Sequence, residues 1–254
     1  MTQTKSNGKV YICGAGPGDP KLITVKAAEL LKTCEVVLYD RLISKKIINL
    51  IPSTSEKLYV GRAAGDPVTR QDNTNQLMIN YAKRGKKVLR LKGGDPFIFG
   101  RGGEEAECLV QNDIKFEIIP GITSAIGSAE YAGIPLTHRK LASSLAIVTG
   151  HEDPDKAAPA VKWDKLASAV DTIVILMGIG KIEKISRSLI QAGVDKNEEI
   201  AVVENGTIKK QRIIKGTLSN IVAKIQDAKV KSPAVIIVGK VVSLQEKLCW
   251  FYEG

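Results

Sequence analysis

Short runs of β-branched and other apolar residues recur along the first half of the chain and alternate with stretches of helical periodicity. Such runs predict strands when they are roughly four to eight residues long and are bounded by turn residues. We expect strands at residues 10–13, 35–39, 57–60, 88–91 and 115–119, and helices at residues 24–32, at 71–83 and from about 103 onward. Strands that alternate with helices imply right-handed crossovers and a largely parallel sheet.

A second series of strands follows the turn at Gly133-Ile134-Pro135. Here we expect strands at residues 145–149, 172–176, 200–203, 211–216 and 234–238, and helices at residues 182–192 and 219–227. The fourth run lies close behind the third, which favours an antiparallel pair and a mixed sheet. The pattern therefore predicts two α/β domains, residues 9–132 with a mainly parallel sheet and residues 133–254 with a mixed one.

The composition is that of an ordinary soluble protein, with 44% hydrophobic and 25% charged residues. No apolar run approaches the roughly 20 residues of a membrane span, and the polar N-terminus lacks the apolar segment of a signal peptide. The four cysteines are scattered without a Cys-x-x-Cys pair, and there are only two histidines. We therefore expect a cytoplasmic protein without a metal site or a disulfide framework.

The formal net charge of +10 is the strongest bias in the composition. Nucleic acid, a membrane surface and a small polyanionic substrate are three partners that such a charge suits. Aromatic residues make up only 5% of the chain, which disfavours a stacking surface for single-stranded nucleic acid. A solvated basic face with no specific partner explains the charge equally well.

The segment from Arg90 to Glu105 holds five glycines together with Asp95-Pro96, more than a turn between a strand and a helix needs. Glycine adopts positive φ and lets another molecule approach the main chain closely. The segment follows an apolar run and precedes a helical pattern, so we place it at the carboxyl end of a strand, where open α/β sheets bind ligands. A glycine-rich surface turn is the alternative.

A second glycine loop, Gly14-Ala15-Gly16-Pro17-Gly18-Asp19-Pro20, follows the first predicted strand. It differs from the dinucleotide fingerprint because Asp19 stands where the third glycine is required. Its two prolines also remove amide donors that a pyrophosphate would use, and no Gly-Lys-Ser/Thr follows to make a Walker A loop. We infer a nucleotide-like ligand without a diphosphate.

Several segments stand in order along the chain: Gly14 to Pro20, Tyr39-Asp40-Arg41-Leu42, Arg90 to Glu105, Pro120-Gly121-Ile122-Thr123-Ser124-Ala125, Gly133-Ile134-Pro135-Leu136-Thr137-His138-Arg139 and Val148-Thr149-Gly150-His151. Together they resemble the tetrapyrrole methylase family, from about Val10 to Val242. The segments at 90–105 and 133–139 are specific to the branch that methylates uroporphyrinogen III, whereas the loop at 14–20 is shared by the wider family.

The resemblance implies a homodimeric enzyme that binds S-adenosyl-L-methionine in a cleft between its two domains and releases S-adenosyl-L-homocysteine. This cofactor carries no phosphate, which agrees with the first glycine loop. By similarity, the expected cofactor contacts are Pro17, Gly93, Gly94, Asp95, Ile98, Thr123, Ser124, Met177, Gly206 and Ala234. A position in the core is the alternative for Met177, and capping of a helix is the alternative for Thr123 and Ser124.

The implied reaction transfers methyl groups from sulfur to two ring carbons of uroporphyrinogen III and yields precorrin-2, the entry to sirohaem and cobalamin. The substrate is a polycarboxylate, which suits a basic protein with arginines at its site. Arg41, Arg101 and Arg139 lie in matching motifs, and we expect them to bind substrate. A solvent-exposed arginine is the alternative for each.

A proton leaves the macrocycle as each methyl group is added, so a base is required. Asp40 follows an apolar strand and is our candidate for it, with a helix cap or an ion pair with Arg41 as the alternative. The family usually carries a lysine where this chain has Arg62, an arginine where it has Ala63 and a histidine where it has Pro67. We assign Arg62 to catalysis, although an arginine holds a carboxylate better than it donates a proton.

Three other functions compete with this interpretation. One is a sister methylase that acts on a later precorrin, and another is a family member that methylates RNA or protein. The third is a basic binding module, which has no need of the glycine loops. We expect no nucleic-acid or membrane partner, and no appended dehydrogenase or ferrochelatase domain, since the sequence ends soon after Val242.

Overall fold

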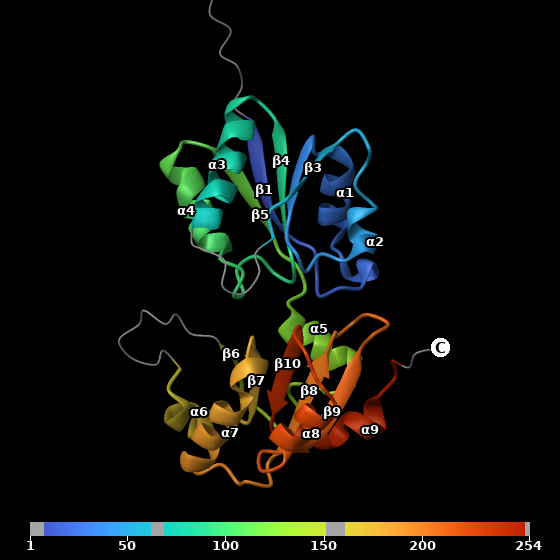
Figure 1. Ribbon diagram of the computed structural model, residues 1–254, viewed down its shortest axis with the longest axis vertical. Coiled ribbons are helices and arrows are strands. Elements are labelled where there is room, and N and C mark those ends of the chain that lie inside the picture. Colours follow the sequence, from blue (N-terminus) through green and yellow to red (C-terminus); the bar gives the residue numbers. More distant parts are fainter. Residues whose placement is uncertain (1–7, 62–68, 151–160, 252–254) are drawn as a thin grey trace, which may run out of the picture. The chain divides into compact units, whose positions relative to one another are not determined.

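A computed structural model describes residues 8–61, 69–150 and 161–251 of the chain (Figure 1). Its contacts divide into two compact units, Met1–Thr123 and Ser124–Gly254. The described part of each unit contains one five-stranded sheet. The predicted pair of α/β domains is therefore confirmed.

The sheet of the first unit is entirely parallel in its strand pairs, with the order β3-β2-β4-β1-β5. Its strands are β1 (Lys9–Gly14), β2 (Val36–Tyr39), β3 (Glu56–Tyr59), β4 (Lys87–Lys92) and β5 (Lys115–Ile119). Its helices are η1 (Pro20–Leu22), α1 (Val25–Thr33), α2 (Lys45–Ile48), α3 (Thr69–Lys83) and α4 (Gly102–Gln111). All five predicted strands are present within a residue or two of their expected bounds.

Helices cover both faces of this sheet (Figure 1). On one face Leu31 of α1 and Ile47 of α2 pack with Leu89 of β4, and on the other Met78 of α3 and Leu109 of α4 share a core. Successive side chains of a strand point to opposite faces, so a central strand covered on both sides must be apolar throughout. β4 departs from this rule because it buries two cations, which belong to the site described below.

The sheet of the second unit is mixed, with the order β6-β7-β10-β8-β9. Its strands are β6 (Leu145–Thr149), β7 (Thr172–Leu176), β8 (Glu199–Glu204), β9 (Arg212–Thr217) and β10 (Ala234–Val238). Its helices are α5 (Ser124–Tyr131), α6 (Trp163–Ala169), η2 (Ile179–Lys181), α7 (Ile182–Gln191), α8 (Ile221–Asp227), η3 (Lys240–Leu244) and α9 (Gln245–Leu248). The predicted antiparallel pair is β8 with β9, and its register confirms the prediction.

Helix α5 packs with the second sheet, and this determines where the two units divide. Ala125 and Ala129 are fully buried against Val174 of β7 and Val235 of β10. The division therefore follows Thr123, ahead of the boundary after residue 132 that the sequence suggested. The small residues of α5 let it lie close to the sheet, whereas nothing in their local pattern says which sheet they cover.

Candidate functional site

Three loops meet at the carboxyl edge of the first sheet through closely packed glycines. The Gly94 amide donates to the Gly16 carbonyl at 2.8 Å, and the Gly16 amide donates back at 3.2 Å. A Cβ atom on Gly14 would lie 2.5 Å from the Gly94 oxygen, and one on Gly121 would lie 2.3 Å from the same atom. The backbone approach of the chain to itself therefore requires glycine at positions 14 and 121, with no ligand needed to explain it.

Gly93 differs from these glycines. A Cβ atom there would meet only the Leu42 Cβ, at 3.3 Å, and Gly93 does not have positive φ. It is half-buried at the same edge, one residue beyond β4. The contact with Leu42 is tight but involves a single side-chain atom, and backbone strain does not explain the lack of a side chain, so Gly93 is the glycine of this edge that best fits close approach by a ligand.

Asp95 cross-links the loops. Its Oδ1 accepts hydrogen bonds from the amides of Phe97 at 2.8 Å and Ile98 at 3.2 Å, while Oδ2 accepts one from the Gly121 amide at 3.0 Å. A carboxylate accepts about four hydrogen bonds, so capacity is left for a ligand hydroxyl or ammonium group. Its contact with the cofactor stays a prediction, and its work within the protein is to fix the shape of the loop.

The loop from Phe97 to Arg101 presents its side chains to solvent. Phe97, Ile98 and Phe99 are between 41% and 56% exposed, and Phe99 and Arg101 have φ of 53° and 58°. Positive φ in such residues costs on the order of 1–3 kcal/mol and concentrates at functional sites. The Arg101 Nε donates to Glu104 Oε1 at 3.0 Å, so the guanidinium is held beside the loop while staying partly exposed.

Asp40 lies where β2 ends and is the exposed member of a buried charge cluster. Its Oδ1 accepts a hydrogen bond from the Arg90 Nη2 at 2.7 Å, and the Asp40 side chain is 27% exposed. The predicted alternative, an ion pair with Arg41, is not the pairing observed. Arg41 itself is exposed. Arg62, with Pro67, lies outside the described residues, so its predicted catalytic role stays a prediction.

Arg90, Lys92 and Glu105 form the rest of this cluster. The Arg90 Nε and the Lys92 Nζ both donate to Glu105 Oε1, at 3.0 and 2.9 Å, and all three side chains are at most 4% exposed. Burial alone would lower the pKa of Arg90, but the carboxylates of Glu105 and Asp40 outweigh it and the net shift is upward. Burial, aided by the charge of Arg90, lowers the pKa of Lys92.

These three residues stand in the motifs above without a predicted role. A signal was present, because Arg90 and Lys92 point to one face of a strand whose other residues after Lys87 are apolar. Buried cations require partner carboxylates, and Glu105 lies in the first turn of α4, the helix that covers that face.

The remaining predicted residues of the first unit are Pro17 and Thr123. Pro17 is half-buried in the loop after β1, and Thr123 is buried with 7% exposure. Ser124 opens α5 and belongs to the second unit. The structure thus gathers Pro17, Gly93, Gly94, Asp95 and Asp40 at the edge where the parallel strands β1, β2 and β4 end.

The second sheet has a comparable edge. β6, β7 and β8 run parallel and β10 runs against them, so Met177, Gly206 and Ala234 all lie at one edge. Met177 is 52% exposed, which rules out the core position considered for it. A Cβ atom on Gly206 would lie 2.3 Å from the Ser128 Oγ, so packing against α5 requires that glycine.

Backbone strain concentrates at this second edge. Met177, Asn205 and Thr207 have φ of 56°, 51° and 69°, values that side-chain-bearing residues adopt rarely. Such strain persists where the surrounding structure imposes it and is typical of ligand sites. Arg139 is not brought to this edge: it is exposed in the loop that precedes β6, two residues from Leu141.

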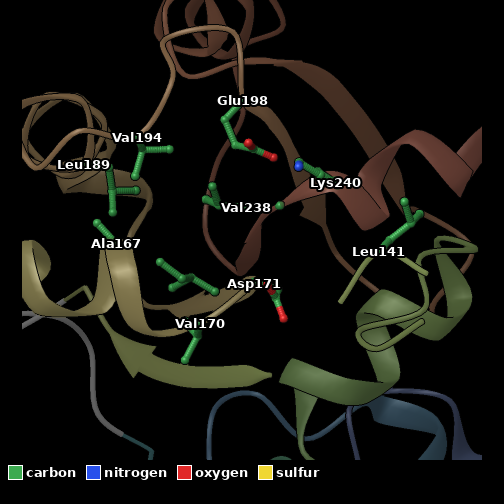
Figure 2. A pocket seen from close by; sticks show the side chains of 11 residues that line it. Leu141, Ala167, Val170, Asp171, Leu189, Val194, Glu198, Val238 and Lys240 are labelled. Atoms are coloured by element: carbon green, nitrogen blue, oxygen red, sulfur yellow. The ribbon is translucent and has the colours of Figure 1, made fainter. Parts of the chain in front are cut away.

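Leu141 lines a cavity of about 190 Å³ at the opposite edge of the second sheet (Figure 2). Asp171 and Glu198, which immediately precede β7 and β8, line it too, and Glu198 and Lys240 point toward one another. Burial raises the pKa of Glu198. The cavity is smaller than the roughly 300 Å³ at which small-molecule sites begin and lies away from Met177, so we do not assign the cofactor to it.

In the described ranges no three His, Cys, Asp or Glu side chains gather in a way that would hold a metal ion. None of the helices in those ranges combines the length and apolar character needed to cross a membrane.

Comparison with known proteins places the chain among the tetrapyrrole methylases. It is 48% identical over 241 residues to an S-adenosyl-L-methionine-dependent uroporphyrinogen III methyltransferase of Methanosarcina barkeri, with 95% of this chain and 94% of that protein covered. It is also 48% identical over 244 residues to a siroheme synthase of Pseudoalteromonas atlantica, with 96% of this chain but only 52% of that protein covered. The chain thus spans about half the length of that relative.

A solved structure gives the same result. The uroporphyrin-III C-methyl transferase of Thermus thermophilus, complexed with S-adenyl homocysteine, superimposes with a TM-score of 0.79 at 39% identity, covering 92% of this chain and 93% of that one. The family model of the tetrapyrrole (corrin/porphyrin) methylases matches residues 9–222. The resemblance seen in the motifs is confirmed, and the chain belongs to the tetrapyrrole methylase family.

Proposed function

We propose that the chain is an S-adenosyl-L-methionine-dependent C-methyltransferase that converts uroporphyrinogen III to precorrin-2 by two methylations, on the route to sirohaem and cobalamin. The observation that carries the proposal is the identity of 48%, over 95% of this chain, with a relative whose name states that cofactor and substrate. The proposal covers methylation alone, because the siroheme synthase relative is about twice as long as the matched region.

The residues present fit the cofactor. When bound, S-adenosyl-L-methionine supplies an electrophilic methyl group on a sulfonium. Gly93 leaves room beside the main chain, Asp95 keeps acceptor capacity for a hydroxyl or ammonium group, and Met177 offers an exposed, polarizable side chain. The proline-containing loop after β1 offers few amides for a pyrophosphate, which favours a nucleoside without phosphates.

The proposed substrate contacts are Arg41 and Arg101, and Arg139 stays a proposed contact on the resemblance alone, because it does not lie at the edge that holds Met177. The net charge of +10 attracts a polycarboxylate at long range, and exposed arginines bind carboxylates in bidentate pairs. Arg101 is already paired with Glu104, so a substrate carboxylate would compete with that contact. Arg41 is exposed one residue beyond Asp40, where it can hold substrate next to the proposed base.

We assign the proton acceptor to Asp40. Its carboxylate is reachable from solvent on one side and hydrogen-bonded to Arg90 on the other. Alignment of the substrate carbon with the methyl group is the main work left to the protein, because the sulfonium is already reactive. Arg62 stays a proposed catalytic residue on the resemblance alone.

Anaerobic incubation of the protein with S-adenosyl-L-methionine and uroporphyrinogen III tests the proposal. We expect a product heavier by two methyl groups, found by mass spectrometry, and release of S-adenosyl-L-homocysteine. Methylation only of precorrin-2 would place the chain with the sister methylases. Transfer of a labelled methyl group from S-adenosyl-L-methionine to RNA or protein, with none to the tetrapyrrole, would contradict the proposed substrate class.

We also propose a cytoplasmic homodimer, on the resemblance alone. Light scattering after gel filtration measures the assembly directly. Twice the chain mass of 27.4 kDa supports the dimer, and the mass of a single chain contradicts it.

A further inference from the structure

Burying the charge cluster behind Asp40 costs free energy. Arg90, Lys92 and Glu105 are almost fully removed from solvent, and a buried ion pair of this kind is often no more stabilising than apolar residues of the same volume. Val88 precedes the two cations on the same face of β4 and packs in an ordinary apolar core. The cost of burial suggests that the cluster serves the reaction, since the fold alone does not need it.

The hydrogen bonds show which member of the charge cluster contacts Asp40. The Arg90 guanidinium spans two carboxylates, with Nε on Glu105 at 3.0 Å and Nη2 on Asp40 at 2.7 Å. A third contact runs from Nη1 to the Leu91 carbonyl at 3.3 Å. Glu105 is in turn held by the Lys92 ammonium at 2.9 Å. Arg90 is therefore fixed from behind by two elements, β4 and α4, and presents one fixed donor to Asp40.

We propose that Arg90 is a positioning residue for the methyl-transfer reaction: clamped by Glu105, it holds one oxygen of Asp40, so that the carboxylate meets the substrate in a single orientation. This inference rests on the proposed function and on Asp40 as the proton acceptor. In each methylation the sulfur–methyl bond breaks, a carbon–methyl bond forms, and Asp40 takes the proton that the macrocycle releases. The free oxygen of Asp40 is the one available for that proton.

A double-mutant cycle in the full chain tests the proposal, with Arg90→Lys, Asp40→Asn and both together. A lysine keeps the charge, but one ammonium cannot span both carboxylates as the guanidinium does. We expect Arg90→Lys to lower kcat roughly tenfold, with KM for uroporphyrinogen III and Kd for S-adenosyl-L-homocysteine nearly unchanged. In the Asp40→Asn background the same change has no further effect, because Arg90 acts through Asp40.

The matched control is Arg187→Lys, at an exposed arginine paired with Glu183 on α7, which leaves activity unchanged. An equal loss of kcat in both Asp40 backgrounds overturns the proposal, and so does a parallel loss of cofactor binding and thermal stability. If Arg90→Lys fails to fold, Glu105→Gln replaces it in the cycle, because it loosens the same clamp while leaving the Arg90 guanidinium in place.

Carbon-13 labelling of the aspartate carboxyls separates this inference from the proposed function. The Asp40→Asn spectrum assigns the Asp40 signal, and Arg90→Lys is expected to shift and broaden that signal, because the carboxylate is no longer held in a single orientation. Absence of methyl transfer by the wild-type protein, with the Asp40 signal still altered by Arg90→Lys, refutes the proposed function and leaves the clamp standing. An Asp40 signal that Arg90→Lys leaves unchanged refutes the clamp.

Discussion

The carboxyl edges of the two sheets both carry an irregular main chain, but they differ in what supports it. At the first edge glycines at positions 14 and 121 let three loops come together, and β4 and α4 hold a buried charge cluster. At the second edge Met177, Asn205 and Thr207 keep their side chains despite positive φ, as Phe99 and Arg101 do in the loop beyond the first. The first edge is thus distinguished by close packing and charge, and the second by one exposed side chain of this kind, Met177.

Gly121→Ala is expected to have the largest effect, because it attacks the packing of the first edge directly. The new Cβ would lie 2.3 Å from the Gly94 carbonyl oxygen, and that atom is backbone and cannot rotate away. We expect a loss of about 3 kcal/mol in the free energy of unfolding, together with loss of cofactor binding. Urea unfolding and calorimetry measure the two.

The matched control for it is Gly103→Ala in the first turn of α4, where a Cβ atom would meet nothing within 4 Å. That change is expected to raise stability by up to about 1 kcal/mol. Equal losses in the two variants would mean that close packing does not distinguish position 121.

Gly93→Ala tests whether a glycine of the first edge serves a ligand, since a Cβ atom at position 93 would meet a single neighbouring atom. Stability is expected to change by less than about 1 kcal/mol, because the new methyl group meets only Leu42. The affinity for S-adenosyl-L-homocysteine is expected to fall roughly tenfold, because the methyl group occupies space that the ligand needs. Unchanged affinity by calorimetry would remove Gly93 from the cofactor site.

Met177→Gly tests the second edge, where stability and binding should move in opposite directions. Glycine relieves the positive φ, and the exposed side chain gives up little burial, so unfolding becomes harder by up to about 1 kcal/mol. Affinity for S-adenosyl-L-homocysteine is expected to fall about threefold to tenfold, because the side chain no longer covers the ligand.

Lys229→Gly is its control, at another exposed residue with positive φ, just beyond α8. It gains the same stability with no change in affinity. A Met177→Gly variant that binds as tightly as the wild type would show that the strain at this edge serves no ligand.

Arg62→Lys has the smallest expected effect and tests the catalytic role proposed for Arg62. Lysine restores the residue that the family usually has there, so we expect kcat to stay the same or rise. The steady-state rate with uroporphyrinogen III is the measurement. A loss of more than about tenfold would assign Arg62 a contact that depends on the guanidinium fork.

Much of the fold could be predicted because its evidence is local. The apolar runs mark each strand, and the short gap between β8 and β9 indicates an antiparallel pair. Helix α5 is different, since its alanines would suit either sheet and only long-range contacts assign it to the second. The four-residue helix α2 is too short for periodicity to register.

For the site, the sequence predicted which segments gather at the sheet edges, but it did not predict the contacts that their individual residues make. It linked the two glycine-rich loops to a ligand, whereas the nearest neighbour of Gly14 is another loop of the same chain. It also passed over Arg90 and Lys92, whose partner Glu105 is thirteen residues beyond Lys92 on a different element. Ion pairs between residues on different elements can be identified only in the folded structure.

The cross-link made by Asp95 has a thermodynamic consequence. Because its two oxygens already bind three amides, the loop at the first edge keeps its shape without any ligand. We expect the cofactor binding proposed there to involve no folding of this loop, and its heat-capacity change to report mainly the surface that the ligand itself covers. Analogues that differ in the transferred group alone are therefore expected to bind with nearly equal heat-capacity changes, and differences in their affinity to reflect direct contacts.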